Sequence, residues 1–343
     1  MKTLDKYRGC LIGGAVGDAL GYAVEFVGEA SIFTKYGENG ITEYELVKDK
    51  ALFSDDTQMT LFTANALLLR TKDAVECGKC SPYRDYLTYC YKCWYVTQED
   101  GEFDTSRSWL MEIPELYSRR APGLTCLASL GNGKIGTLKK PMNQSKGCGG
   151  VMRVAPIGLY LDEKHHTVEE IAGLGAEAAV ITHGHELGYI PAAAFAHIIY
   201  LAANRDDMTM VEIVEEALDG VRRVFHEGEY AKQFLDLMNL ALDLAENEDE
   251  DLDAIHQLGA GWVAEEALAI AVYCAAKYEN DFEKAVVAAV NHGGDSDSTG
   301  AIAGNILGAY LGMQEIPEKY LENLELKDVI LKMADELYEN PEV

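Results

Sequence analysis

The chain has 343 residues, 48% hydrophobic and 25% charged, a composition typical of a soluble globular protein with a sizeable core. Its formal net charge of −28 disfavours binding to nucleic acids or anionic membranes, because both are polyanions. The N-terminal apolar run is interrupted by Asp18 and Glu25, unlike a signal peptide, and no uncharged apolar run reaches the roughly 18 residues that span a bilayer. We therefore expect a cytoplasmic protein.

Two segments, one near each end of the chain, carry a glycine at every fourth position. These glycines are Gly9, Gly13, Gly17 and Gly21, and then Gly300, Gly304, Gly308 and Gly312. Each glycine costs a helix about 1 kcal/mol relative to alanine, so such a ridge persists where backbones must approach closely. We expect both segments to be helices that pack against neighbours at short range and form the centre of the fold.

Apolar residues at helical spacing predict further helices beginning near residues 57, 170, 191, 230, 261 and 282, and an amphipathic helix with a polar tail closes the chain. Strand signals are scarce, and no linker rich in Pro, Gly or Ser divides the chain. We expect an all-α protein with one compact helical domain over residues 1–343. The acidic run 246–253 is expected to be a solvated loop.

Cysteine pairs could form a structural zinc site. Cys77 and Cys80 form one C-x-x-C pair, and Cys90 and Cys93 form another. The gap between the pairs is short for a zinc ribbon, and the segment from Pro82 reads as one continuous helix. On such a helix Cys90 and Cys93 lie on one face, where cysteine behaves as a small apolar residue. We favour core cysteines over zinc.

The sequence SDDT, residues 54–57, precedes an apolar helix. Ser54 or Asp55 can cap that helix, and an acid near a helix N-terminus is favoured by the dipole. Capping explains one acid but not both Asp55 and Asp56, because adjacent carboxylates repel and are costly to bury without a cation.

The sequence DSDSTG, residues 295–300, raises the same problem again. Asp295 and Asp297 match the first half of an EF-hand loop, but the position of the bidentate Glu is Ile306, so this is not an EF-hand. Ser298 or Thr299 adds a hydroxyl. Oxygen ligands without His or Cys suit Mg²⁺, Mn²⁺ or Ca²⁺. Together the two acidic clusters favour one shared two-cation site that activates water.

A glycine-rich segment around residue 148 could bind phosphate. Glycines at positions 147, 149 and 150 can expose backbone N–H groups to phosphate oxygens, although a plain tight turn also explains them. Cys148 has no assigned basic partner, which argues against a nucleophile.

Five single residues complete the candidate set. His183 and His185 do not share a helical face, so a phosphate or ribose contact is more plausible than metal chelation, and a satisfied histidine is the default. Asp18 is expected to accept hydrogen bonds from another loop. Glu25 lies near a helix end, where a carboxylate opposes the dipole, which hints at function. Asp104 can cap the segment that follows it.

Together, these motifs resemble those of a known family. GDALGYAVEF, SDDTQMTLFTANAL, GCGGVMRVAPIGL, THGHELGY and HGGDSDSTGAIAGNILGA look like successive motifs of the ADP-ribosylglycohydrolase family, from about residue 8 to residue 312. That family includes dinitrogenase reductase-activating glycohydrolases and hydrolases of ADP-ribosyl-arginine and ADP-ribosyl-serine. The resemblance implies an all-α fold with two Mg²⁺ ions in a cleft, with Mn²⁺ as a possible substitute.

The resemblance also implies roles for individual residues. The metal ligands would be Ser54, Asp55, Asp56, Asp295, Asp297 and Ser298. Glu25 falls where the serine-linkage hydrolases carry a catalytic Glu, and Asp104 falls near the acid of the nitrogenase-regulating branch. With Asp56 and Asp297 they are the candidate catalytic acids. The ADP-ribose pyrophosphate would contact Gly147, Cys148, Gly149, Gly150, Met152 and His183. Some relatives carry Asn at the position of Cys148, which puts that side chain's contact in question.

The implied function is Mg²⁺-dependent removal of ADP-ribose from modified protein side chains. Cleavage of the N-glycosidic bond to arginine is favoured because the DSDST version with Ser298 resembles the arginine branch. Hydrolysis of serine O-linked or other ADP-ribose derivatives is an alternative, as are a catalytically silent binder or structural protein and a calcium-binding module. The expected partners are a modified protein and the ADP-ribose product, and the expected state is a monomer.

Overall fold

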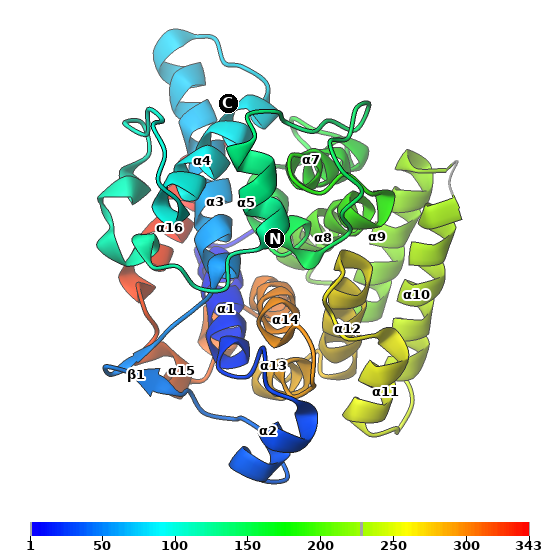
Figure 1. The fold of residues 1–343 in the computed structure, drawn as a ribbon. Helices are drawn as coiled ribbons and strands as arrows, with labels where there is room; N and C mark the ends of the chain where they lie inside the picture. The colour runs from blue at the N-terminus through cyan, green and yellow to red at the C-terminus, as the bar shows by residue number, and fades with distance from the viewer. Residues whose placement is uncertain (1, 227–228, 343) are drawn as a thin grey trace.

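The computed structural model describes residues 2–226 and 229–342, and its regular secondary structure is almost entirely helical, as predicted (Figure 1). The α-helices are α1 (Leu4–Tyr22), α2 (Glu29–Tyr36), α3 (Asp55–Cys77), α4 (Tyr83–Gln98), α5 (Leu124–Gly131), α6 (Ala155–Tyr160), α7 (Val168–Val180), α8 (Glu186–Asn204), α9 (Met210–Val224), α10 (Glu229–Ala245), α11 (Asp251–Leu258), α12 (Ala264–Lys277), α13 (Phe282–Val290), α14 (Ser296–Leu311), α15 (Glu318–Leu321) and α16 (Lys327–Glu339).

Helices α1 and α14 lie at the centre of the molecule (Figure 1). They pack antiparallel, with their glycines facing one another. A Cβ atom added to Gly13 would lie 2.3 Å from the carbonyl oxygen of Gly304, and one added to Gly17 would lie 1.9 Å from that of Gly300. No side chain fits in these positions. The predicted close packing of each glycine-bearing helix against a neighbour is confirmed, and the structure shows that this neighbour is the other glycine-bearing helix.

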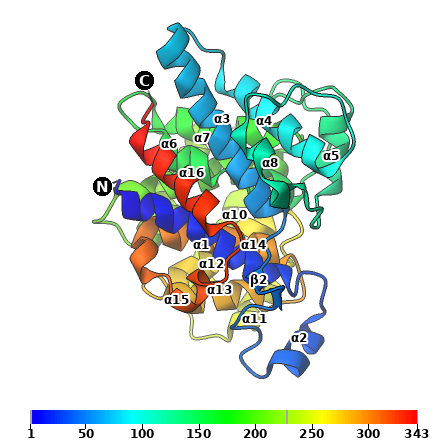
Figure 2. The same ribbon diagram turned by 90° about the vertical axis from the view of Figure 1, so that its left-hand side faces the viewer.

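The remaining helices surround this pair. Helices α8, α12 and α13 pack on α14, whereas α16 crosses α1 on the opposite side (Figure 2).

Among the described residues, α8 is the one helix long and apolar enough to cross a membrane, and 89% of its most apolar window is buried inside the fold. It serves here as a core helix. The helices predicted near residues 57, 170, 191, 230, 261 and 282 are all present.

A short hairpin leads the chain toward α3. Strands β1 (Leu46–Val47) and β2 (Lys50–Ala51) pair antiparallel across a two-residue turn. Both turn residues have positive φ, 51° at Lys48 and 63° at Asp49, which suits the twist of a tight hairpin. The sequence analysis did not predict these strands, since each is only two residues long. The hairpin also joins the C-terminal region, because the Ala51 N–H donates to the Asn323 carbonyl (2.9 Å).

The acidic run 246–253 is not entirely a solvated loop, and that prediction is wrong at its end. Asp251 begins α11 and accepts hydrogen bonds from the hydroxyls of Tyr273 (2.7 Å) and Tyr278 (2.9 Å). Lys277 completes the contact with an ion pair at 3.0 Å. Partners 22 or more residues away in sequence hold this acid, so local charge could not reveal its role.

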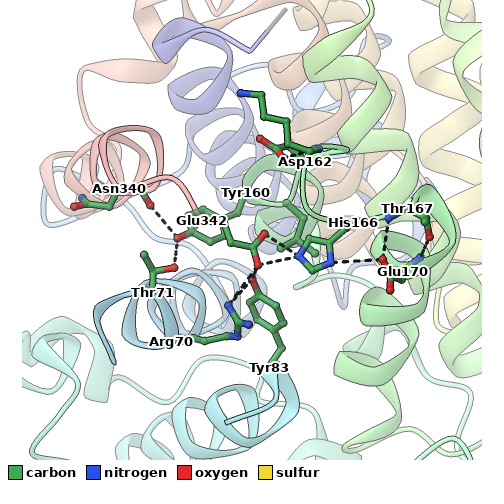
Figure 3. Close-up of polar contacts among 12 residues, drawn as sticks. Arg70, Thr71, Tyr83, Tyr160, Asp162, His166, Thr167, Glu170, Asn340 and Glu342 are labelled. Atoms are coloured by element: carbon green, nitrogen blue, oxygen red, sulfur yellow. Dashed lines mark hydrogen bonds and ion pairs between the residues drawn. The ribbon is translucent and has the colours of Figure 1, made fainter. Parts of the chain in front are cut away.

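The C-terminal tail is likewise more than a polar end. The buried Glu342 carboxylate lies between Arg70 and Tyr83 on one side and His166 on the other (Figure 3). The His166 Nε2 atom lies 2.8 Å from both carboxylate oxygens. Contacts with α3, α4 and the loop before α7 therefore anchor the end of the chain.

The four paired cysteines do not form a metal site. Cys90 and Cys93 are fully buried on α4, whereas Cys77 and Cys80 are exposed. Among the described residues, the only cluster of side chains that could hold a metal is one of carboxylates. The favoured assignment of core cysteines is therefore correct for Cys90 and Cys93 and wrong for Cys77 and Cys80, which lie at the surface.

The glycine contact predicts a large effect of adding one methyl group. We expect Gly304→Ala to lower the free energy of unfolding by about 3 kcal/mol, because the new Cβ would lie 2.0 Å from the Gly13 carbonyl oxygen, a backbone atom that cannot rotate away. Gly173→Ala in α7 is the matched control, since a Cβ there meets nothing within 4 Å and should stabilise by about 0.5–1 kcal/mol. Urea titration measures both. Equal stability of Gly304→Ala and wild type would contradict the close approach.

Candidate metal centre and ligand site

The start of α3 presents two buried carboxylates that are not needed for capping. The Ser54 hydroxyl caps the helix by accepting from the Asp56 N–H (3.2 Å). Asp55 Oδ2 accepts from the backbone N–H of Gly123 (3.1 Å), just before α5. Asp56 Oδ1 is buried without a hydrogen-bond partner. Since Ser54 caps the helix, both acids are available for another role.

Asp18 of α1 fixes the position of this helix start. Its Oδ1 accepts from the Ser54 N–H (2.8 Å), and its Oδ2 accepts from the Thr57 N–H (2.9 Å) and hydroxyl (2.6 Å). The expectation that Asp18 binds backbone donors of another loop is therefore confirmed. Burial, and next the charge of Asp297, raise the pKa of Asp18 to about 7 against the effect of these hydrogen bonds.

The start of α14 is held by a histidine and by a distant carbonyl. His292 Nδ1 accepts from the Gly294 N–H (3.1 Å), and its Nε2 lies 3.0 Å from the Thr299 hydroxyl. The Asp295 N–H donates to the Ala260 carbonyl (2.8 Å). These bonds close the turn that carries Asp295 into the helix.

Glu25 joins the acids of α14. It lies in the turn after α1, and one oxygen each of Glu25, Asp295 and Asp297 lie within 4.8 Å of one another. All three residues are buried, and Glu25 Oε2 has no hydrogen-bond partner. Three carboxyl groups from the two ends of the chain thus converge on one point.

Burial, together with the charge of neighbouring acids, raises the pKa of Glu25, Asp55, Asp56 and Asp295. Burial, and then the charges of Asp297 and Asp295, raise the pKa of Glu25 to about 10. Burial raises the pKa values of Asp55, Asp56 and Asp295 well above the usual range, with Asp297 contributing to each. The charge of Asp297 thus acts on acids at the starts of both α3 and α14, while Asp55 and Asp56 lie outside the group of Glu25, Asp295 and Asp297 whose oxygens are within 4.8 Å of one another.

This group of residues fits a hard divalent cation. In the described part of the chain no Lys or Arg forms an ion pair with Asp55, Asp56, Asp295, Asp297 or Glu25. Two buried carboxylate oxygens, Glu25 Oε2 and Asp56 Oδ1, lack any partner. Buried carboxylates without counter-charges must be protonated or bound to a cation, and oxygen donors suit Mg²⁺, Mn²⁺ or Ca²⁺.

The glycine-rich segment packs against the same acids. It contains the short 3₁₀ helix η3 (Cys148–Gly150). The Cys148 N–H donates to the Trp262 carbonyl (3.3 Å), and its thiol donates to Asp295 Oδ2 (2.7 Å). Burial, and next the charge of Asp295, raise the thiol pKa, so this sulfur is a hydrogen-bond donor and not a nucleophile.

Met152 and His183 also lie at this segment. The Ser298 hydroxyl lies 4.0 Å from the Met152 sulfur. A Cβ added to Gly149 would lie 3.1 Å from Cε1 of His183, so the glycine leaves room for the imidazole. His185 instead caps α8, where its Nδ1 accepts from the Leu187 N–H (3.0 Å). Of the two histidines, His183 is the one beside the glycines.

Asp104 does not join the other candidate acids. It is exposed on the segment after α4, where its Oδ1 accepts from the Ser106 N–H (3.1 Å). Hydrogen bonds from Ser106 lower its pKa. The structure therefore gives no support to the catalytic role that the resemblance implied for Asp104. A local turn explains the residue, in keeping with the capping alternative.

Two residues at the site were not found from sequence. The Gly123 N–H that binds Asp55 leaves no trace in sequence, because the donor is a backbone group. Arg153, three residues after Gly150, is fully buried. The sequence could have pointed to it, because it is the single charged residue in the apolar run VMRVAPIGL.

Comparison with known proteins gives a consistent result. The sequence model of the ADP-ribosylglycohydrolase family matches residues 1–343. The chain is 25% identical to ADP-ribosylhydrolase ARH3 of Mus musculus, covering 94% of this chain and 88% of that protein. It is 24% identical to ADP-ribosylarginine hydrolase Tri1 of Pseudomonas putida, covering 98% and 79%. A solved structure described as an ADP-ribosylglycohydrolase-related protein complex shares the fold, with a TM-score of 0.63, 24% identity and 98% coverage of both chains.

The family match spans the whole chain, the relatives named are hydrolases, and the motifs that carry Glu25 and Asp295–Asp297 meet at one buried acidic cluster. The chain belongs to the ADP-ribosylglycohydrolase family of enzymes.

Proposed function

We propose that this protein is a Mg²⁺-dependent hydrolase that releases ADP-ribose from modified protein side chains, with the N-glycosidic bond to arginine as its first substrate. The observation that carries the proposal is the convergence of Glu25 with Asp295 and Asp297 beside the glycine-rich segment. This places a candidate acid, a candidate cation site and a candidate phosphate site next to one another.

Two Mg²⁺ ions, with Mn²⁺ as a substitute, would be held by oxygen ligands from both clusters. The ligands would be Ser54, Asp55, Asp56, Asp295, Asp297 and Ser298. When bound, such ions lower the pKa of a coordinated water and bind ribose hydroxyls.

Glu25 would act as the general acid and base. Its buried surroundings favour the protonated carboxyl, and the unpartnered Oε2 can donate that proton to the leaving atom of the glycosidic bond. The carboxylate that results can take a proton from the water that attacks the anomeric carbon. This assignment replaces Asp104, whose exposed position supports no such role.

The glycine-rich segment would bind the diphosphate of ADP-ribose. The Cys148 N–H already donates to the Trp262 carbonyl, so the donor to a phosphate oxygen would be a neighbouring backbone N–H such as that of Gly149, with Gly147, Cys148, Gly150, Met152 and His183 around the ligand. With a net charge of −28, the protein is expected to depend on this local site and on the cations to bind a dianionic ligand.

We also propose a cytoplasmic monomer that binds neither nucleic acid nor membrane.

Serine O-linked ADP-ribose is a second candidate substrate. The position of Glu25 in the acidic cluster favours it, because the resemblance assigned this residue to the serine-linkage branch. Similarity to an ADP-ribosylarginine hydrolase supports arginine instead. The test is to measure the release of ADP-ribose from arginine-, serine- and aspartate-modified proteins, with Mg²⁺ and then with EDTA. The substrate that is cleaved fastest distinguishes the arginine linkage from the serine linkage. Absence of Mg²⁺-dependent release from every substrate would refute hydrolase activity and favour a silent binder.

The assignment of the catalytic acid predicts a selective loss of activity. We expect Glu25→Gln to lower kcat about 100-fold or more and to leave ADP-ribose binding within about twofold, because Gln keeps the shape but cannot act as an acid. Glu29→Gln is the matched control, since that acid pairs with His256 at the surface. Asp104→Asn should retain activity. A large loss of kcat in Asp104→Asn, together with a wild-type kcat in Glu25→Gln, would show that Asp104 and not Glu25 is the catalytic acid.

The raised carboxyl pKa values predict how pH and Mg²⁺ affect stability. Between the usual carboxyl pKa and the raised values, the folded protein without metal binds more protons than the unfolded chain. Its stability should therefore fall as pH rises from about 5 to about 8. Mg²⁺ displaces these protons, so its stabilising effect should be larger at about pH 8 than at about pH 6.

Melting temperatures in EDTA and in Mg²⁺ across this pH range test the expectation. The control is Asp297→Asn, which removes a ligand and should lose the Mg²⁺ effect. Equal stabilisation by Mg²⁺ at both pH values would show that the cation does not compete with protons at the acids.

A further inference from the structure

Arg153 is a fully buried cation without a carboxylate partner among the described residues. Its guanidinium stacks on the Tyr91 ring at 4.1 Å, and its Nη1 contacts the sulfur atoms of Met59 (3.5 Å) and Cys126 (3.4 Å). Its Nε has no partner. An unpaired buried charge is costly, so its retention three residues after the glycine-rich segment calls for an explanation.

The shortest hydrogen bond of Arg153 is to Thr182, the residue next to His183. Its Nη2 donates to the Thr182 hydroxyl oxygen (2.8 Å). The same hydroxyl lies 2.8 Å from His183 Nδ1 and 3.4 Å from the Ala179 carbonyl. Because Thr182 has one hydroxyl proton and accepts from a cation, that proton is best placed on the shorter bond, toward Nδ1.

The proton of the imidazole must then be on the other nitrogen. Burial, followed by the charge of Arg153, lowers the pKa of His183 to about 3, so the ring is neutral. With Nδ1 accepting from Thr182, Nε2 carries the hydrogen. Nε2 has no hydrogen-bond partner within the described ranges, and it faces the glycine-rich segment, 3.4 Å from where a Cβ of Gly147 would lie.

We infer that Arg153 and Thr182 are positioning residues that fix His183 as a neutral donor, with its Nε2–H directed at a phosphate oxygen of the nucleotide ligand. The inference deepens the proposed function and rests on it for the identity of the ligand. A neutral donor adds no charge that must be desolvated when the ligand binds. With one fixed tautomer, Nε2 is a hydrogen-bond donor in every molecule and an acceptor in none.

The tautomer can be tested without any ligand. The ¹⁵N NMR spectrum of the ligand-free protein should show His183 with a protonated Nε2 and an unprotonated Nδ1. Thr182→Val, which keeps the shape and removes the hydroxyl, should lose this single tautomer, whereas Thr182→Ser should keep it. A proton on Nδ1 in wild type would overturn the inference, as would an unchanged tautomer in Thr182→Val. Circular dichroism of Thr182→Val verifies its fold.

Binding of ADP-ribose, measured by calorimetry, tests the consequence. Thr182→Val should weaken binding about tenfold, as loss of an orienting partner does for metal-binding imidazoles, and Thr182→Ser should restore it. His183→Gln, whose amide N–H can replace the Nε2 donor, should bind more tightly than His183→Ala, which should lose at least about tenfold. Equal binding by these two variants would refute the donor role. No binding by wild type would refute the proposed function, whereas the NMR result decides the Thr182–His183 contact independently.

Discussion

The backbone contact between α1 and α14 determines where the chemistry can take place. At Gly13 and Gly17 the two helices approach so closely that any side chain would meet a carbonyl oxygen. The contact continues to Gly21, which faces the carbonyl of Ser296 at the start of α14. As a result the C-terminal end of α1, with Glu25 just beyond it, lies beside Asp297. Glu25 and Asp297, more than 270 positions apart in sequence, thus share one site because of glycines that have no catalytic or ligand-binding side chain.

The second constraint is electrostatic. Five carboxyl groups, those of Glu25, Asp55, Asp56, Asp295 and Asp297, are buried around this point without an ion-pair partner in the described residues. Burial raises the pKa of most of them, so protonation or a cation must remove their charge. Two buried guanidinium groups lie nearby and neither pairs with the acids: Arg153 donates to Thr182, and Arg120 donates to the Phe53 carbonyl and pairs with Glu325. Under the proposed function, divalent cations would neutralise these acids and offset the stability that their burial costs the metal-free protein.

Much of this could be predicted from sequence, because glycine ridges, paired acids and helical periodicity are local patterns. The close packing of the two glycine-bearing helices and the presence of both acidic clusters followed from such patterns, whereas the contact of α1 with α14 itself was first seen in the structure. What depended on distant partners could not be predicted. Asp251 and Glu342 looked solvated, and both are held by tyrosines and cations remote in sequence. Asp104 was assigned from motif position alone, and its local turn keeps it at the surface. Arg153 was visible as a lone charge in an apolar run, but its contact with Thr182 required the fold.

The central claim is that α3 and α14 hold cations between them, each supplying half of the ligands. A crystal grown with Mn²⁺ and measured near the manganese absorption edge tests it most directly. The account predicts anomalous peaks bound at once by a carboxylate of Asp55 or Asp56 and one of Asp295 or Asp297. Manganese bound to one cluster alone, or no peak between the two helix starts, would contradict it.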